Sequence, residues 1–461
     1  MRDILPKKLQ ELALNCTKPL YVVGGSVRDH LAGLQSNTHD WDICSPTSTD
    51  EFLSIATENG FTAKAVYRNT GTIKLQDSEG VDYEYSCFRS DKYVRGTHVP
   101  VEIFFTDDIV LDAKRRDFTA NAVYYDVKSG NYVDPLNGIA AIKEKRFTTV
   151  VDSDKVFGED GLRLMRLARQ AAQLGFSPDE ACFAGAKQNA ALIKDITPER
   201  IFTELTAILD ADRKYGNADG PYNGLRLLEQ IGVLGEILPE LMLGKNMVQR
   251  ADFHKYDVLE HSLRAVRYAA PCVRLTALLH DVGKPFCKLR DGNTYEHHTE
   301  GATIATNVLT RWKAPKNMIE HIPALVQWHM YDFDCKTNEN KLRRFFITHY
   351  ELLDELLLLK QADFSACADD LSTAPTCVKW NAILQKMKAE KTPFSVKELA
   401  VSGKDILNLN VPPRHVSKIL QSLLLHTACQ PHDNTKKRLS VLAIGIEKEL
   451  LKSETTLPGT R

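Results

Sequence analysis

Two aspartates and a pair of glycines lie close together near the start of the chain, in "YVVGGSVRDHLAGLQSNTHDWDICS" at residues 21–45. Asp40 and Asp42 flank a tryptophan in a short apolar run. In a strand, residues two apart point to the same face. Two neighbouring carboxylates repel each other and require a shared cation, and Mg²⁺ prefers hard oxygen ligands of this kind. Asp-x-Asp is also common in solvated turns, so the context has to decide between these interpretations.

The backbone before the aspartates has the features of a polyphosphate site. Gly24 and Gly25 follow an apolar run, and Arg28 and Asp29 come next. Glycine lets the backbone approach a phosphate closely, and a helix start with an arginine favours negative charge. A triphosphate held there would lie beside Mg²⁺, which fits phosphoryl or nucleotidyl transfer. The GxxxxGK[ST] pattern of a Walker A loop is absent from the sequence.

The elements that must position these groups change in type along the chain. Short β-branched or aromatic runs predict strands in the first 145 residues: "LYVVGG", "WDIC", "TIKLQ", "VDYEYSCF" and "AVYYDV". One of them places Glu84 as a third carboxylate, with Tyr83 and Tyr85 on the opposite face. Helical periodicity follows, as in the stripe Ile201, Leu205, Ile208 and Leu209 behind the Thr197–Pro198 cap. We predict an α/β head with a mixed sheet and helices, followed by an all-α neck, body and tail.

Composition excludes several classes of protein. A chain of 461 residues is too long for one core, and 43% apolar with 26% charged residues is ordinary for a soluble protein. The formal net charge of −1 means that any RNA would be held by local patches. The ten cysteines contain no CxxC pair, and no apolar run is long enough for a membrane span. With no signal-peptide pattern, these features indicate a cytoplasmic protein with reduced thiols.

Seven motifs occur in a fixed order: "GGSVRD", "DWDI", "EYSCFR", "RRDFTANA", "DPLNG", "EDGLRLMRLARQAAQLGF" and "PERIFTEL". This series resembles the bacterial-type (class II) tRNA nucleotidyltransferases, the CCA-adding enzymes, and bacterial poly(A) polymerases share much of it. The resemblance covers about the first 240 residues and returns at "VSGKDILNL". It implies a catalytic nucleotidyltransferase head at 1–145, a helical neck at 146–215, a body at 216–375 and a tRNA-binding tail at 376–461.

The segment "EDGLR" matches the family's nucleotide-reading motif. Asp160 and Arg163 are three apart on a predicted helix and are expected on one face. An ionised aspartate only accepts hydrogen bonds and an arginine only donates them. Cytosine and adenine each present an amino donor beside an unprotonated ring nitrogen, whereas guanine and uracil present the reverse. The pair would therefore select C and A, although a surface salt bridge is the commoner meaning of this spacing.

The resemblance implies further nucleotide contacts. In "RRDFTANA", Arg115, Arg116, Asp117 and Asn121 would contact the phosphates and sugar, and Asp117 or Asn121 could bind the 2′-OH. Arg166 and Arg200 would bind the nucleotide from the neck, although Arg200 could also be a surface residue at a helix start. Residues 89–111 resemble the loop that helps to switch from C to A addition. That segment keeps Arg95 where a denser Arg-Pro pattern is typical, which leaves partial addition open.

Half of the histidines gather in one segment, with seven of fourteen between residues 254 and 329. The pattern H…HD…D resembles the HD phosphohydrolase superfamily, over about residues 254–365. The resemblance implies divalent-metal ligands at His261, His280, Asp281 and Asp363, with His297 and His329 as further ligands and Lys284 beside a phosphate. Imidazole and carboxylate suit Mn²⁺ or Ni²⁺, and Mg²⁺ less well. The site could trim cyclic or terminal phosphates from RNA ends, or it could be vestigial.

The leading hypothesis is an enzyme that adds C, C and A to tRNA 3′ ends from CTP and ATP. It would use Mg²⁺ on Asp40 and Asp42, need no nucleic-acid template and have no obligate protein partner. Alternatives are a poly(A) polymerase, a CC-only or A-only enzyme, and an HD phosphohydrolase with an inactive head. The segment "YRNTGTIKL" favours the tRNA enzymes, and intact "GGSVRD" argues against an inactive head. A non-catalytic RNA-binding protein is disfavoured by the near-neutral charge.

Overall fold

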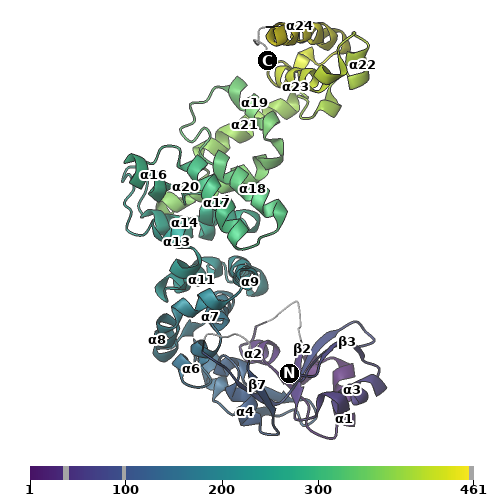
Figure 1. The fold of residues 1–461 in the computed structure, drawn as a ribbon, viewed down its shortest axis with the longest axis vertical. Coiled ribbons are helices and arrows are strands. Elements are labelled where there is room, and N and C mark those ends of the chain that lie inside the picture. Colours follow the sequence, from purple (N-terminus) through teal and green to yellow (C-terminus); the bar gives the residue numbers. More distant parts are fainter. Residues whose placement is uncertain (35–40, 96–99, 456–461) are drawn as a thin grey trace, which may run out of the picture. The chain divides into compact units, whose positions relative to one another are not determined.

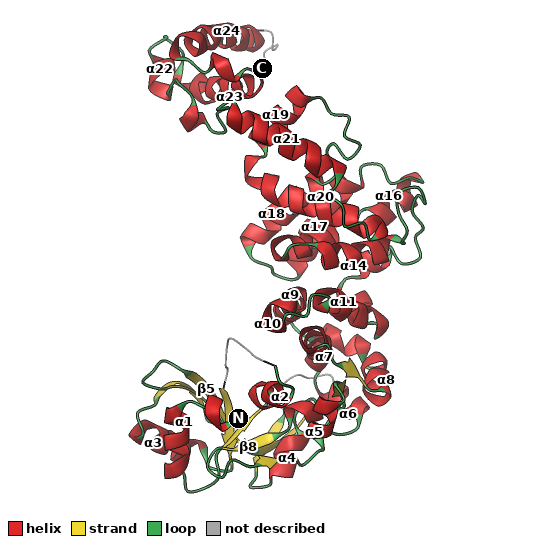
Figure 2. Ribbon diagram, turned by 180° about the vertical axis from the view of Figure 1, so that it is seen from behind, coloured by secondary structure: helices red, strands yellow, loops and turns green. Residues whose placement is uncertain are grey.

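The computed structural model describes residues 1–34, 41–95 and 100–455 (Figure 1). The chain divides into two compact units. The first unit comprises residues 1–248, 257–267 and 303–320, and the second comprises 249–256, 268–302 and 321–461. Every described strand belongs to the first unit (Figure 2). The expected α/β head followed by a helical remainder is therefore confirmed.

A seven-stranded mixed sheet forms the centre of the head, in the order β3-β4-β5-β2-β1-β8-β9. The neighbours β2 and β5 run parallel, and the other pairs are antiparallel. All five predicted strand runs are confirmed, whereas β3 and β9 were not predicted. The strands are β1 (Tyr21–Val23), β2 (Trp41–Ser45), β3 (Thr62–Tyr67), β4 (Thr72–Gln76), β5 (Asp82–Cys87), β8 (Tyr124–Asp126) and β9 (Tyr132–Val133).

Two short ribbons stand apart from this sheet. The strand β6 (Arg89–Lys92) pairs antiparallel with β7 (Glu102–Phe105), and β10 (Arg146–Phe147) pairs parallel with β11 (Ser177–Pro178). The chain leaves β5 and enters β6 after a single residue, Phe88, which is buried in the head core. The β6–β7 ribbon therefore starts directly from the strand that bears Glu84.

One face of the sheet is packed and the other presents polar groups. Tyr83 and Tyr85 of β5 are buried while Glu84 between them is exposed, as the alternation predicted. The ring of Phe52 stacks on Tyr85 with centroids 3.6 Å apart, so its helix covers the face opposite Glu84. The head helices are α1 (Lys7–Asn15), α2 (Gly25–Leu31), α3 (Thr49–Glu58), α4 (Ile109–Lys114) and α5 (Gly138–Lys143).

Eight helices complete the described part of residues 146–248. The predicted stripe on α9 is buried at all four positions, and α9 begins at Pro198 as expected. Helix α7 packs against both α9 and α11. Only a side of α7 that these two helices leave uncovered can face the site. The helices are α6 (Ser153–Glu159), α7 (Leu162–Leu174), α8 (Glu180–Gln188), α9 (Pro198–Leu209), α10 (Asp212–Tyr215), α11 (Gly220–Gln230), α12 (Val233–Ile237) and α13 (Pro239–Met242).

The rest of the described chain is helical. Three helices have residues in both units: α14 (Val258–Tyr268), α17 (His297–Arg311) and α18 (Lys316–Trp328). No helix in the described ranges combines the length and the apolar character needed to span a bilayer. The remaining helices are α15 (Arg274–Leu279), α16 (Lys284–Asp291), α19 (Glu339–Thr348), α20 (Leu353–Ala368), α21 (Pro375–Ala389), α22 (Gly403–Leu407), α23 (Pro413–Cys429) and α24 (Lys436–Thr455). The finer division into head, neck, body and tail stays a prediction.

The close approach of α7, α9 and α11 depends on Gly224. A Cβ atom there would lie 2.7 Å from the Ile208 side chain and 2.8 Å from Cβ of Ala172. Gly224→Ala should destabilise the protein by about 1–3 kcal/mol, because overpacking outweighs the helix-propensity gain of about 0.5–1 kcal/mol. Chemical denaturation followed by circular dichroism measures this. The control is Gly235→Ala on α12, whose Cβ would make an ordinary 3.6 Å contact with Met242; equal behaviour of the two variants would contradict the packing argument.

Candidate active site

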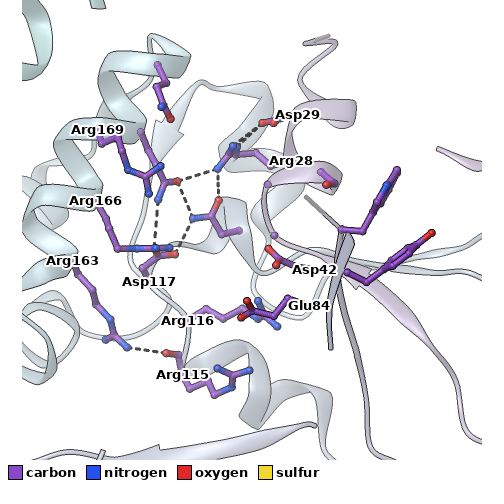
Figure 3. A pocket seen from close by; sticks show the side chains of 18 of the residues that line it. Arg28, Asp29, Asp42, Glu84, Arg115, Arg116, Asp117, Arg163, Arg166 and Arg169 are labelled. Carbon is purple, nitrogen blue, oxygen red and sulfur yellow. Dashed lines mark hydrogen bonds and ion pairs between the residues drawn. The ribbon is translucent and has the colours of Figure 1, made fainter. Parts of the chain in front are cut away.

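Two carboxylates lie side by side on the exposed face of the head sheet. In the parallel pairing of β2 with β5, Asp42 is the partner of Glu84, and both side chains are exposed. Both line a cavity of about 1250 Å³ (Figure 3). Asp40 lies outside the described residues, so its pairing with Asp42 stays a prediction. Among the predicted catalytic residues, the structure therefore brings together Asp42 and Glu84.

The glycine pair leaves room for one of these carboxylates. Gly24 has φ +82°, a conformation that residues with a side chain rarely adopt. A Cβ atom on Gly24 would lie only 3.0 Å from Oδ2 of Asp42. Gly25 begins α2, and both glycines line the cavity. The turn thus brings bare backbone against Asp42, while its contact with a phosphate stays a prediction.

Arg28 is buried within the protein. Its Nε and Nη2 donate to Oδ1 of Asp29 at 2.9 and 2.7 Å. Its Nη1 donates to Oδ1 of Asn121 at 2.7 Å and to Oε1 of Gln170 at 3.0 Å. Asp29 also accepts a hydrogen bond from the hydroxyl of Tyr215. These bonds join α2 to α7, so Arg28 holds the walls of the cavity in place (Figure 3).

Asp117 is the acceptor at the centre of the same network. Oδ1 accepts from the backbone N–H of Phe118 and from Nδ2 of Asn121, both at 2.8 Å. Oδ2 accepts from Nε and Nη2 of Arg166 at 2.9 and 2.7 Å. Burial alone would raise the pKa of Asp117, but the charge of Arg166 and these hydrogen bonds hold that pKa well below its usual range. The carboxylate is therefore ionised and fixes Arg166.

A second buried carboxylate holds two neighbouring arginines. Asp112 accepts from Nε of Arg115 at 2.7 Å, Nη2 of Arg116 at 3.0 Å and the hydroxyl of Tyr124 at 2.7 Å. Fixed guanidinium groups suit the oxygens of a triphosphate. The arginines that line the cavity are Arg28, Arg89, Arg115, Arg116, Arg163, Arg166, Arg169 and Arg200.

Asp160 and Arg163 both line the cavity, but the expectation that they share a helix is wrong. Asp160 follows the end of α6 in an extended conformation, and α7 begins at Leu162. Its Oδ1 accepts the N–H of Leu162 at 2.9 Å, so the side chain satisfies one of the free donors at a helix start. The ion pair of Arg163 is with Glu159, at 3.2 Å.

Gln170 lines the cavity and was not predicted as a site residue. It is 3% exposed, and it accepts hydrogen bonds from both Arg28 and Asn121. The signal was a polar stripe: Arg163, Arg166, Gln170 and Gln173 are spaced by three, four and three residues, which is one face of a helix. Lys74, Asp91, Tyr93, Arg169 and Lys214 also line the cavity and were not predicted as site residues.

The histidine segment forms a second cluster, in the second unit. Asp281, His297 and His329 are buried, and their ligand atoms all lie within 4.8 Å of one another. Nε2 of His297 is 3.3 Å from both Nε2 of His329 and Oδ1 of Asp281. Ligands bonded at about 2.1 Å to one ion are separated by about 3 Å or more, so these spacings fit a shared metal ion.

The orientation of the imidazoles also fits metal binding. Nδ1 of His280, His297 and His329 faces a backbone carbonyl oxygen three residues back, at 2.7, 2.8 and 2.7 Å. Such a bond places the proton on Nδ1 and leaves Nε2 for a metal. Burial lowers the pKa of His329 to about 4, whereas burial is outweighed at His280 by the charge of Asp281, which raises the pKa of His280 to about 10.

The other predicted ligands divide between the units. His280 caps the end of α15, and Asp281 lies in the following turn, so the two residues lie between helices. Nε2 of His280 is 3.5 Å from Oδ1 of Asp363. Lys284 is paired with Asp281 at 2.6 Å. His261 is buried on α14, within the stretch 257–267 of the first unit, and its role as a ligand stays a prediction.

Two family patterns match the first unit. Residues 20–148 match the poly(A) polymerase head domain, and residues 175–243 match the probable RNA- and SrmB-binding site of polymerase A. The cavity described above is lined mainly by residues of the first match and by α7, which lies between the two. The two matches place a polymerase head pattern and an RNA-binding pattern on either side of α7.

Similarity over most of the chain gives the family. The chain is 31% identical to the A-adding tRNA nucleotidyltransferase of Deinococcus radiodurans, over 87% of its own length and 90% of that protein. It is 30% identical to the CC-adding tRNA nucleotidyltransferase of Thermus thermophilus, over 85% of each. The Bacillus stearothermophilus CCA-adding enzyme in complex with CTP has the same fold, with a TM-score of 0.66 at 21% identity over 97% of this chain and 98% of that one. The chain belongs to the tRNA nucleotidyltransferase family and is an enzyme of that class.

Gln170 should be needed both for stability and for the nucleotide site. Gln170→Ala removes one of the two acceptors of Arg28 Nη1 and one of the two acceptors of Asn121 Nδ2, which should cost about 1–3 kcal/mol of unfolding free energy. Because Arg28 and Asn121 then lose their fixed positions, the KM for nucleotides should also rise. Denaturation and steady-state primer extension measure the two effects. Gln188→Ala, an exposed glutamine at the end of α8, should change neither; equal effects would show that Gln170 has no special role.

Proposed function

We propose that the protein adds C, C and A to the 3′ end of tRNA from CTP and ATP, with Mg²⁺ and without a nucleic-acid template. The observation that carries the proposal is a single cavity holding three sets of groups. These are the Asp42–Glu84 pair, the fixed arginines, and the Asp160 and Arg163 side chains. The full-length similarity to tRNA nucleotidyltransferases supports tRNA as the acceptor.

The chemistry follows from the charges of the site. The 3′ oxygen of the tRNA forms a bond to the α-phosphorus of the nucleotide, and the bond from that phosphorus to the bridging oxygen of pyrophosphate breaks. Asp42 and Glu84 form an anionic pair suited to Mg²⁺, with Asp40 as the further predicted ligand. When bound, Mg²⁺ stabilises negative charge on the reacting oxygens. The arginines held by Asp112 and Asp117 neutralise the triphosphate and orient it.

The neck side of the cavity is suited to base selection. Asp160 presents a carboxylate acceptor and Arg163 a guanidinium donor, the combination that pairs with C and A. Glu159 and two backbone carbonyl oxygens occupy three of the N–H groups of Arg163, so a wrong base would leave the remaining donors without acceptors. Each mismatched contact to a charged group costs about 1–3 kcal/mol.

The number of nucleotides added has three competing answers, CCA, CC alone and A alone, because two long relatives are named as an A-adding and a CC-adding enzyme. The test uses tRNA ending at the discriminator base and tRNA ending in CC, each with CTP, ATP or both. Sequencing of the product ends should show CCA on the first substrate and A on the second. Products limited to CC, or to A on the CC-ending tRNA only, would replace the proposal with the corresponding specialised activity.

Asp42→Ala should reduce nucleotide incorporation by at least about a thousandfold, because it removes a carboxylate from the reacting centre. The side chain is exposed, so folding and tRNA binding should be retained. Primer extension with CTP and filter binding of tRNA measure the two properties. The control is Asp50→Ala, an exposed aspartate of α3 in the same head. Near-normal turnover of Asp42→Ala in Mg²⁺ would overturn the role of Asp42.

The two single variants, Asp160→Ala and Arg163→Ala, should each retain nucleotidyl transfer but should also incorporate G and U. The discrimination between CTP and UTP should fall by about tenfold or more for each residue. Incorporation of each nucleotide at saturating tRNA measures this. Lys155→Ala, an exposed change on α6, is the control. If both variants remain selective for C and A, other residues read the base.

We further propose a metal-dependent phosphohydrolase activity for the second unit. Three observations support it: the buried Asp281–His297–His329 cluster, the Nδ1 bonds that direct each Nε2 to it, and the adjacent His280–Asp363 pair. These residues would hold one or two divalent ions such as Ni²⁺ or Mn²⁺, which supply Lewis acidity toward a phosphate. The substrate class that this would serve is a 2′,3′-cyclic or terminal phosphate of RNA.

His297→Ala should remove a bound divalent ion and the hydrolysis of a 2′,3′-cyclic nucleotide in Ni²⁺ or Mn²⁺. CTP incorporation should not change, because the residues lining the head cavity all belong to the first unit. Metal content after dialysis is measured by mass spectrometry, in parallel with phosphate release. His298→Ala, the adjacent residue, is the control. An absence of bound metal in the unaltered protein would contradict the second activity.

A further inference from the structure

An aromatic residue, Tyr93, lies against Arg163, the arginine proposed to read the base. Tyr93 comes directly after β6 and lines the nucleotide cavity. The centre of its ring is 5.7 Å from Cζ of Arg163. We propose that Tyr93 is a positioning residue that fixes the plane of the Arg163 guanidinium and so sets the accuracy of base selection. The inference rests on the proposed function, in which Arg163 reads the base.

The edges of Arg163 are held by the protein. Nη1 donates to the carbonyl oxygen of Val156 at 2.9 Å and to Oε2 of Glu159 at 3.2 Å. Nη2 donates to the carbonyl oxygen of Arg115 at 2.9 Å (Figure 3). Within the described residues these bonds use three of the five N–H groups, which leaves two for a ligand. Arg163 is 6% exposed, so its remaining donors have a restricted set of directions.

Tyr93 supplies the constraint that these hydrogen bonds do not. Hydrogen bonds at the edges still allow a planar guanidinium to tilt about its long axis. An aromatic ring over one face opposes that tilt, since cation–π attraction is lost as the plane turns away. A base that accepts and donates in the guanidinium plane needs that plane fixed, because bidentate recognition depends on geometry. Burial, followed by the charge of Asp91, raises the pKa of Tyr93, so the ring stays neutral and its face attracts the cation.

The chain close to Tyr93 is anchored to α6 and to the end of α8 through Arg95. Arg95 donates to both carboxylate oxygens of Asp154, at 3.0 and 2.9 Å, and to Oδ1 of Asn189 at 2.7 Å. Asn189 is 1% exposed and donates in turn to Asp154 at 3.0 Å. A Cβ atom on Gly158 would lie 2.9 Å from Nη1 of Arg95, so the helix surface is bare where the arginine crosses it. Two residues from the ring, the chain is thus tied to α6 and to the end of α8.

This arrangement makes the ribbon and the base-reading arginine parts of one structure. The anchor through Arg95 restricts where Tyr93 can lie, and Tyr93 restricts the orientation of Arg163. The proposed positioning of Arg163 uses the face of the Tyr93 ring and does not use the hydroxyl. A phenylalanine should therefore serve as well as the tyrosine, and an aliphatic residue should not. A residue that merely fills space would tolerate leucine.

The test compares Tyr93→Leu with Tyr93→Phe in primer extension. The ratio of kcat/KM for CTP to that for UTP, on tRNA ending at the discriminator base, should fall by about three- to thirtyfold in Tyr93→Leu. The fall should come mainly from a higher kcat/KM for UTP in Tyr93→Leu. The ratio in Tyr93→Phe should match that of the unaltered protein. Arg95→Ala should shift the ratio in the same direction, and it provides a second measurement should Tyr93→Leu unfold. Lys92→Ala, an exposed residue of the same ribbon, is the matched control.

Three outcomes would overturn the inference, and they differ in what else they exclude. If selectivity is unchanged in both Tyr93→Leu and Arg95→Ala but is lost in Arg163→Ala, the proposed role of Tyr93 is wrong. The proposed role of Arg163 then stands. If Arg163→Ala keeps its selectivity, the proposed base-reading role of Arg163 is wrong and the present inference fails with it. If Tyr93→Leu lowers the ratio equally with and without Arg163, Tyr93 acts on the base directly and does not position Arg163.

Discussion

A buried network of charged and amide groups links α2 and the segment after α4 to α7, and the site depends on it. Asp117 accepts four short hydrogen bonds, and Gln170 connects Asn121 with Arg28 on the opposite side. Burying such charges is unfavourable unless each one is paired and hydrogen-bonded. Because every partner is needed, the relative positions of α2, α7 and the segment after α4 follow from satisfying this network.

The same requirement gives a chain of net charge −1 a local concentration of positive charge, which the proposed triphosphate site needs. The positive charge is concentrated in one cavity, where Asp112 and Asp117 keep arginines in fixed orientations. Preorganised charges need no rearrangement when the substrate arrives, and this is the main source of electrostatic catalysis. Overall charge therefore says little about polyanion binding by this protein, while the local pairing of arginines with buried acids is informative.

Much of the fold was predictable because its signals are local. Alternation in "VDYEYSCF" predicted both the strand and the exposure of Glu84 between two buried tyrosines, and the stripe on α9 predicted its buried face. The end of α6 was not predictable in the same way. Asp160 was expected within a helix that continues to Arg163, yet the chain extends there and α7 begins at Leu162. An aspartate can cap a new helix as well as occupy an existing one, and sequence periodicity does not distinguish these.

The sequence by itself determined the residue types of the site: the carboxylates, the glycine turn, the arginines and the clustered histidines. It also determined which strand face each residue occupies, because alternation is a property of the local backbone. Only the tertiary structure decided that Asp42 lies beside Glu84, since that depends on the parallel register of two strands about forty residues apart in sequence. The placement of Tyr93 over Arg163 and of Gln170 beside Arg28 was decided in the same way. Contacts between distant segments depend on packing, which no local pattern encodes.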